Sequence, residues 1–102
     1  MDKKKLIKIQ PELDRMRQAS VKASEIQGLA KKLGRRLTKR GKEPMWENER
    51  FEDLPVLAIP DHGGKDLSPG VKHSVLNQLE DDIQAWDELL SKNGSSNGDA
   101  GS

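Results

Sequence analysis

The segment that most constrains this chain runs from Leu54 to Gln78, LPVLAIPDHGGKDLSPGVKHSVLNQ. It opens with a short apolar run enclosed by Pro55 and Pro60, a pattern typical of a short strand. A polar loop follows, and then Ser68 and Pro69 stand in the order favoured at a helix N-cap and first helical position. One segment therefore predicts a strand, a loop and a capped helix, and the flanking sequence must supply elements that pack against them.

The predicted helix extends well beyond this segment. Apolar residues recur at steps of three or four, which places them on one face of a helix. This periodicity predicts a helix that reaches Ser91 or Lys92, with an acidic face in solvent. The apolar positions are Val71, Val75, Leu79, Ile83, Trp86 and Leu90, and the acidic ones are Asp81, Asp82, Asp87 and Glu88.

Upstream, residues 21–34 predict another helix, because Ile26, Leu29, Ala30 and Leu33 fall on one stripe. Gly34 follows, where a left-handed C-terminal cap favours glycine. Three short strands are expected next. They are a basic strand in residues 35–40, a second from Met45 after a turn at residues 41–42, and the apolar run of residues 55–60.

The order helix, three strands, helix predicts an α+β fold in which two helices cover one face of a three-stranded antiparallel sheet. The same α-β-β-β-α order occurs in double-stranded-RNA-binding domains, which read the shape and phosphates of RNA. We expect this domain to span residues 21–92. Residues 1–20 are expected to be a loosely held basic extension, or a short helix with Pro11 in its first turn. The alternative for this segment is a basic arm that grips RNA or an acidic partner. Residues 93–102 are expected to be a flexible Gly/Ser/Asn tail.

Composition narrows the functional classes. The chain has 102 residues and no cysteine, which excludes disulfides, thiolate metal sites and thiol nucleophiles. No apolar run approaches the ~20 residues of a membrane span, and the lysine-rich start has no apolar signal core behind it, so a soluble cytoplasmic protein is expected. Charge is uneven: residues 1–42 hold 14 basic and 4 acidic residues, although the whole chain carries only +1. A basic half favours a phosphate-binding surface, or self-association with the acidic half of a second copy.

The second half of the chain resembles the HicA family of bacterial toxins. In that family a strand ending in proline leads into a histidine-containing loop, and a glycine then opens a helix. The elements that match are Ile59, Pro60, His62, Lys65, Asp66, Leu67, Gly70, Ser74, Val75, Leu76, Asn77 and Gln78. The resemblance covers about residues 21–79, and its first half agrees only in layout.

The resemblance implies a small RNA-cleaving toxin with a fold like that of double-stranded-RNA-binding domains, neutralised by a HicB-like antitoxin. Members carry their catalytic histidine in a Gly-Ser-His turn. Here Gly41-Lys42-Glu43 replaces that turn, so Glu43 occupies the catalytic position. Lys72 also departs from the family by taking a position that is usually apolar.

Metal-free RNA cleavage needs a base, an acid and positive charge near the phosphate. Histidine suits both proton-transfer roles near neutral pH, and the chain offers only His62 and His73. Candidate catalytic residues are therefore Glu43 and His62, although a role in shaping the loop is the simpler interpretation of His62. His73 is expected to be a solvated helix residue. No cofactor and no metal ligand set is expected, because two histidines without cysteines give poor ligand spacing.

The candidate RNA-binding residues are Arg35, Arg36, Lys39, Arg40, Lys42 and Lys65. The simpler interpretation is a charged edge strand that resists aggregation. Trp46 and Trp86 are expected to pack rather than stack on bases. Two functions stay open: a HicA-like toxin that binds RNA and cleaves it from an altered catalytic site, and a non-catalytic RNA- or protein-binding module. A dimer joined through opposite charges is a third alternative.

Overall fold

The fold is that of a computed structural model, which describes residues 1–38, 44–60 and 64–98. The helices are α1 (Lys3–Gln18), α2 (Ala23–Lys32) and α3 (Pro69–Gly98), and the strands are β1 (Arg35–Thr38), β2 (Met45–Asn48) and β3 (Leu57–Ala58). The strands form one antiparallel sheet in the order β1-β2-β3. The expected α+β class and three-stranded sheet are confirmed, but the described chain has a third helix that packs into the core.

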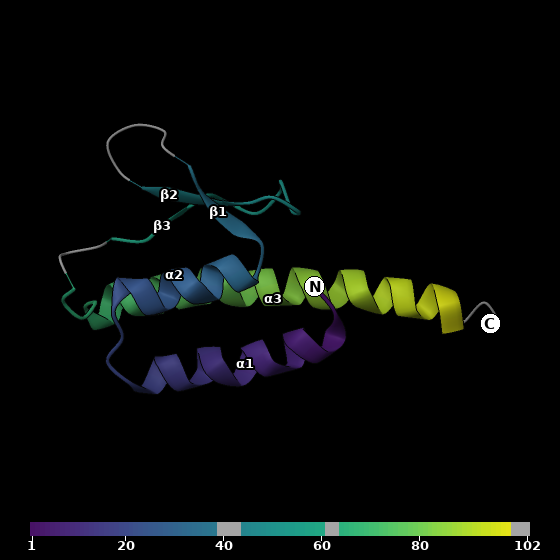
Figure 1. Cartoon of the computed structure of the whole chain (residues 1–102), viewed down its shortest axis with the longest axis horizontal. Helices are drawn as coiled ribbons and strands as arrows, with labels where there is room; N and C mark the ends of the chain where they lie inside the picture. The colour runs from purple at the N-terminus through teal and green to yellow at the C-terminus, as the bar shows by residue number, and fades with distance from the viewer. Residues whose placement is uncertain (39–43, 61–63, 99–102) are drawn as a thin grey trace.

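The elements are arranged in layers, with α2 and α3 between the sheet and α1 (Figure 1). Arg35, Trp46 and Leu57 turn from the three strands toward the helices and are buried. The predicted strand between the two prolines is the shortest, since only Leu57 and Ala58 belong to β3. Proline lacks the N–H that a sheet ladder needs, so Pro55 and Pro60 limit its length.

Helix α1 is part of the core, and the expected loose extension over residues 1–20 is wrong. Leu6, Ile9, Leu13 and Met16 are buried at helical spacing, and α1 packs mainly against α3. Asp2 caps the helix, because its Oδ1 accepts a 2.9 Å hydrogen bond from the Lys5 backbone N–H.

Pro11 lies inside α1 and not in its first turn, which corrects the expected position. A proline in a helix interior costs about 3 kcal/mol or more, because it cannot donate the i→i−4 hydrogen bond. Burial of the apolar face of α1 contributes about 1.5–3 kcal/mol per large side chain. Packing therefore outweighs the local penalty and holds the helix across the proline.

The ends of α2 and α3 agree with most of the predicted signals. Gly34 follows α2 with φ 94°, and its N–H donates to the Lys31 carbonyl at 3.0 Å, as expected for a left-handed cap. Ser68 Oγ accepts from the Val71 N–H at 3.4 Å, directly before Pro69 begins α3. Helix α3 continues to Gly98, six residues past the predicted end at Lys92, so the expected flexible tail is helical over residues 93–98.

Lys72 joins α1 to α3. Its side chain is largely buried, and its ammonium donates to the carbonyl oxygens of Arg17 at 3.1 Å and Ala19 at 2.8 Å. These carbonyls lie at the C-terminal end of α1, where the helix dipole is negative and favours a cation. Lys72 therefore supplies the buried cation that caps the C-terminal end of α1.

The first prediction tests whether α1 belongs to the cooperative core. Leu13 is fully buried, so Leu13→Ala is expected to lower the free energy of unfolding by about 2–5 kcal/mol, because it removes apolar packing and leaves a cavity. Ile7 lies on the same helix but is 69% exposed, so Ile7→Ala serves as the control and is expected to change it by less than about 1 kcal/mol. Urea unfolding monitored by circular dichroism measures both. Equal, small effects would show that α1 does not contribute to the core.

Candidate nucleic-acid interface

Arg35 was predicted to contact RNA, and the structure places it inside the protein. It is 2% exposed and makes a two-pronged ion pair with Asp82 on α3, with Nε–Oδ2 at 2.6 Å and an Nη2–Oδ1 hydrogen bond of 2.8 Å. Its remaining amine, Nη1, donates to the carbonyls of Trp46 and Pro55. The assignment of Arg35 to RNA contact is therefore corrected, because its guanidinium is covered and its donors are used internally.

Asp82 is fully buried, so its predicted place on the acidic solvent face of α3 is wrong. Besides Arg35, it accepts from Asn48 Nδ2 at 3.2 Å. Asn48 also donates to the Leu33 carbonyl at 3.0 Å and accepts from the N–H groups of Arg50 and Phe51. These bonds satisfy the buried polar groups, as a low-dielectric interior requires. The network connects the sheet to α3 and has a structural role.

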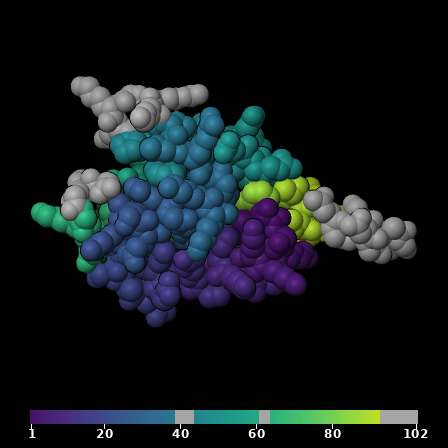
Figure 2. Space-filling model, in the orientation of Figure 1, coloured from purple at the N-terminus to yellow at the C-terminus, as the bar shows by residue number. Residues whose placement is uncertain are grey.

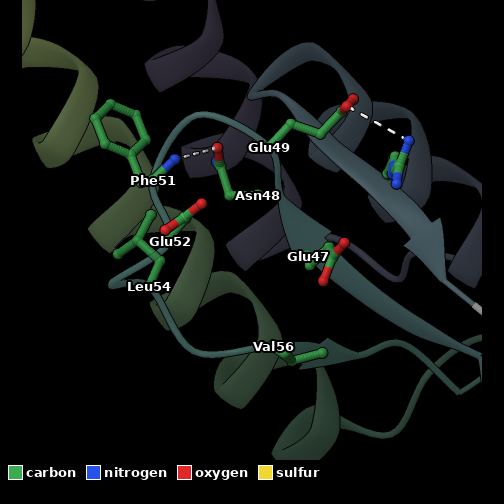
Figure 3. Close-up of a pocket in the computed structure, with 8 residues that line it drawn as sticks. Glu47, Asn48, Glu49, Phe51, Glu52, Leu54 and Val56 are labelled. Carbon is green, nitrogen blue, oxygen red and sulfur yellow. Dashed lines mark hydrogen bonds and ion pairs between the residues drawn. The ribbon is translucent and has the colours of Figure 1, made fainter. Parts of the chain in front are cut away.

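Arg36 points to the opposite side of the sheet and is exposed. Its side chain lies 3.6 Å from Glu49, and Glu47 stands directly across from it on β2. A hollow of about 420 Å³ opens there, and Figure 3 shows the labelled glutamates around it. Its lining combines one arginine, three glutamates, one asparagine and three apolar side chains: Arg36, Glu47, Asn48, Glu49, Phe51, Glu52, Leu54 and Val56. This part of the outer sheet face carries net negative charge and is unfavourable for phosphate.

Of the other candidate RNA-binding and catalytic residues, one is exposed and the rest lie outside the described residues. Lys65 is exposed in the segment before α3 and stays available to a ligand. Lys39, Arg40, Lys42 and Glu43 follow β1 in the sequence, and His62 follows β3; all five lie outside the described residues. Their proposed roles therefore continue to rest on the sequence.

The remaining aromatic and histidine expectations concern described residues. Trp46 is 3% exposed and belongs to the core, which confirms packing over base stacking. Trp86 is partly buried, donates to the Leu33 carbonyl at 2.7 Å, and meets Phe51 edge-on at 4.9 Å between ring centroids. His73 is exposed on α3, as expected for a solvated helix residue.

The described part of the chain presents its lysines mainly on α1 and the end of α2. Lys5 and Lys8 on α1 face Lys31 and Lys32 across a groove of about 500 Å³ that Ile9 and Glu12 complete. Figure 2 shows the two helices side by side on one face of the molecule. Sequence reasoning offered a basic arm in residues 1–20 as an alternative, but it favoured a loose extension and did not place these lysines beside α2. The signal was the spacing of Leu6, Ile9, Leu13 and Met16, which repeats every three or four residues.

Comparison with protein-family models, with curated protein sequences and with solved structures finds no match for this chain. Within residues 1–38, 44–60 and 64–98, no three His, Asp or Glu side chains are placed to hold a metal ion. None of the helices in this part of the chain is long and apolar enough to cross a membrane.

The second prediction separates the two neighbouring arginines of β1. Asp82→Ala leaves the Arg35 charge buried without its partner, and we expect a loss of roughly 3–5 kcal/mol in the free energy of unfolding. Replacing both partners, as in Arg35→Met with Asp82→Leu, is expected to cost less than Asp82→Ala alone, since no buried charge remains. The exposed pair gives the control: Glu49→Ala is expected to cost about 0–1 kcal/mol. Urea denaturation of the wild type and these three variants measures the differences, and equal costs for Asp82→Ala and Glu49→Ala would contradict the structural role of the network.

Proposed function

We propose that this chain is a HicA-like RNA-binding protein, a toxin of a toxin–antitoxin pair whose catalytic site is altered. The observation that carries the proposal is the order of α2, β1, β2, β3 and α3 with antiparallel strand pairing, which agrees with the layout expected from the resemblance. The matched run from Ile59 to Gln78 begins directly after β3 and ends within α3. The fold like that of double-stranded-RNA-binding domains is part of the same proposal.

In this proposal RNA is bound by cations near the β1–β2 connection and by Lys65. Lys39, Arg40 and Lys42 stand between the two strands in the sequence, and phosphate contacts by lysine and arginine supply most sequence-independent affinity for nucleic acid. Burial removes Arg35 from this set, and the pairing of Arg36 with Glu49 weakens its contribution. In this proposal the protein acts in the cytoplasm, together with its RNA target and a HicB-like antitoxin.

Catalysis in this proposal depends on Glu43 and His62. Glu43 replaces the family's histidine as the base, and His62 is the histidine closest to the matched strand end. The alternative is a non-catalytic module that binds RNA or a protein on the same scaffold. The specific observation in its favour is the absence of a histidine from the sequence of residues 39–45, where the resemblance places the catalytic one.

The third prediction concerns RNA binding and cleavage. Purified protein is incubated with a labelled single-stranded RNA in chelator, and binding is measured in parallel at several salt concentrations. We expect salt-sensitive binding, because counterions are released from phosphates. Cutting that is lost in Glu43→Ala or His62→Ala, and kept in the controls Glu88→Ala and His73→Ala, would assign a metal-independent endoribonuclease.

The other outcomes decide between the alternatives. Binding without cutting would assign the non-catalytic module that has kept the RNA surface. Equal cutting by wild type and all four variants would place the chemistry elsewhere. Neither binding nor cutting would contradict the RNA-directed function and indicate a protein partner.

A further inference from the structure

A groove lies between α1 and α2. Its α1 wall is not part of the region that resembles a HicA toxin, because α1 ends at Gln18 and the resemblance begins at about residue 21. We infer that this lysine groove is a second contact surface for the phosphates of RNA, added to the scaffold by α1. The inference rests on the proposed function, since it takes RNA as the ligand. It places a large part of the RNA affinity away from the β1–β2 connection.

The charge of the groove is the first argument. Its described lining holds Lys5, Lys8, Lys31 and Lys32 against a single acid, Glu12. Glu12 pairs with Lys32, with Oε2–Nζ at 3.0 Å, and Lys31 Nζ lies 5.8 Å from the Trp46 ring centroid. The structure gives no partner to the ammonium groups of Lys5 and Lys8 among the residues it describes. The ammonium groups of Lys5 and Lys8 are therefore available to bind an anionic ligand.

The position of these lysines on α1 is the second argument. The start of a helix carries partial positive charge, and lysines in the first turn weaken the helix. Lys3, Lys4 and Lys5 occupy that turn, with only Asp2 as an acid beside them in the sequence. Local helix stability therefore does not account for the cluster. A ligand carrying several negative charges relieves the repulsion among these lysines when it binds.

The chemistry of the lining favours phosphates over a protein partner. Aromatic residues, methionine and arginine are enriched in protein interfaces and supply most of their affinity, whereas lysine is depleted in them. Among the described residues, the groove is lined by one apolar residue, Ile9, which is 4% exposed, so the rest of its apolar surface belongs to the stems of charged side chains. Lysine ammonium groups without an apolar anchor are typical of contacts to a nucleic-acid backbone.

The groove is held in a fixed shape by the core beneath it. Leu6 and Ile9 of α1, and Leu29 and Ala30 of α2, are buried in one continuous apolar cluster. The lysines therefore project from two packed helices. A substitution of an exposed lysine is expected to change the charge of the groove and leave the fold intact.

The test measures binding of a labelled 20-nucleotide single-stranded RNA by fluorescence anisotropy at several salt concentrations. Lys5→Ala with Lys8→Ala is expected to weaken binding about tenfold. The slope of log K against log[salt] is expected to fall by about 1.4, because each neutralised phosphate of a single strand accounts for about 0.7. Arg15→Ala with Arg50→Ala removes the same charge from exposed positions outside the groove, and this control is expected to weaken binding less than twofold.

A third variant protects the test against misfolding. Glu12→Gln removes the acid that lines the groove, so RNA binding is expected to strengthen by about two- to threefold. The expected change is opposite in sign to the loss expected for Lys5→Ala with Lys8→Ala. Thermal unfolding of each variant accompanies the binding measurement.

Each other outcome overturns the inference in a distinct way. If wild type binds RNA and the groove variant matches its control, the groove is not an RNA surface while the proposed function stands. If wild type binds polyglutamate as tightly as RNA with the same dependence on Lys5 and Lys8, the groove recognises an acidic polypeptide. If wild type binds no RNA at all, the inference and the proposed function fall together.

Discussion

The ion pair between Arg35 and Asp82 is the interaction on which the arrangement of the sheet depends. Both side chains are buried, so each would carry a large desolvation penalty without the other. Arg35 pairs with Asn48 in the sheet register, and both side chains bind the same Asp82 carboxylate. A one-residue slip of β1 against β2 would turn one of them to the opposite face and leave buried polar groups unpaired. Asp82, which lies on α3, thus specifies the register in which β1 pairs with β2.

Helix α3 connects this network to the rest of the protein. It packs against β3 on one side and α1 on the other, and Lys72 caps the end of α1 from the same helix (Figure 1). The acidic outer face of the sheet and the lysine groove are therefore two separate surfaces on one core. In the further inference, this separation keeps a phosphate backbone bound along α1 and α2 away from Glu47 and Glu49.

Much of the fold could be predicted from local sequence signals, because caps, prolines and apolar periodicity act within a few residues. Gly34, Ser68 and the three strands were found in this way. The errors at Asp82 and in α1 share one cause: a charged residue on an apolar helix face has no sequence signature that separates burial from exposure. Asp82 lies three residues after Leu79 and four before Trp86, on the buried face of α3. It was predicted to be exposed only because its side chain is acidic. The many lysines of α1 led in the same way to the prediction that residues 1–20 are loosely held. At the candidate RNA-binding site, the sequence identified the basic residues, but it could not show that Arg35 is buried.

Helix α1 is an integral layer of the domain, and this position fixes its lysines beside α2. Native-state hydrogen exchange tests it directly, because each amide reports the free energy of the opening that exposes it. If α1 belongs to the cooperative core, the amides of Leu13 and Met16 will exchange with the same free energy as those of Leu76 and Leu79 in α3. If α1 is only loosely attached, its amides will exchange through a local opening of much lower free energy while α3 stays protected. That result would show that α1 is a loosely attached extension and not a layer of the domain.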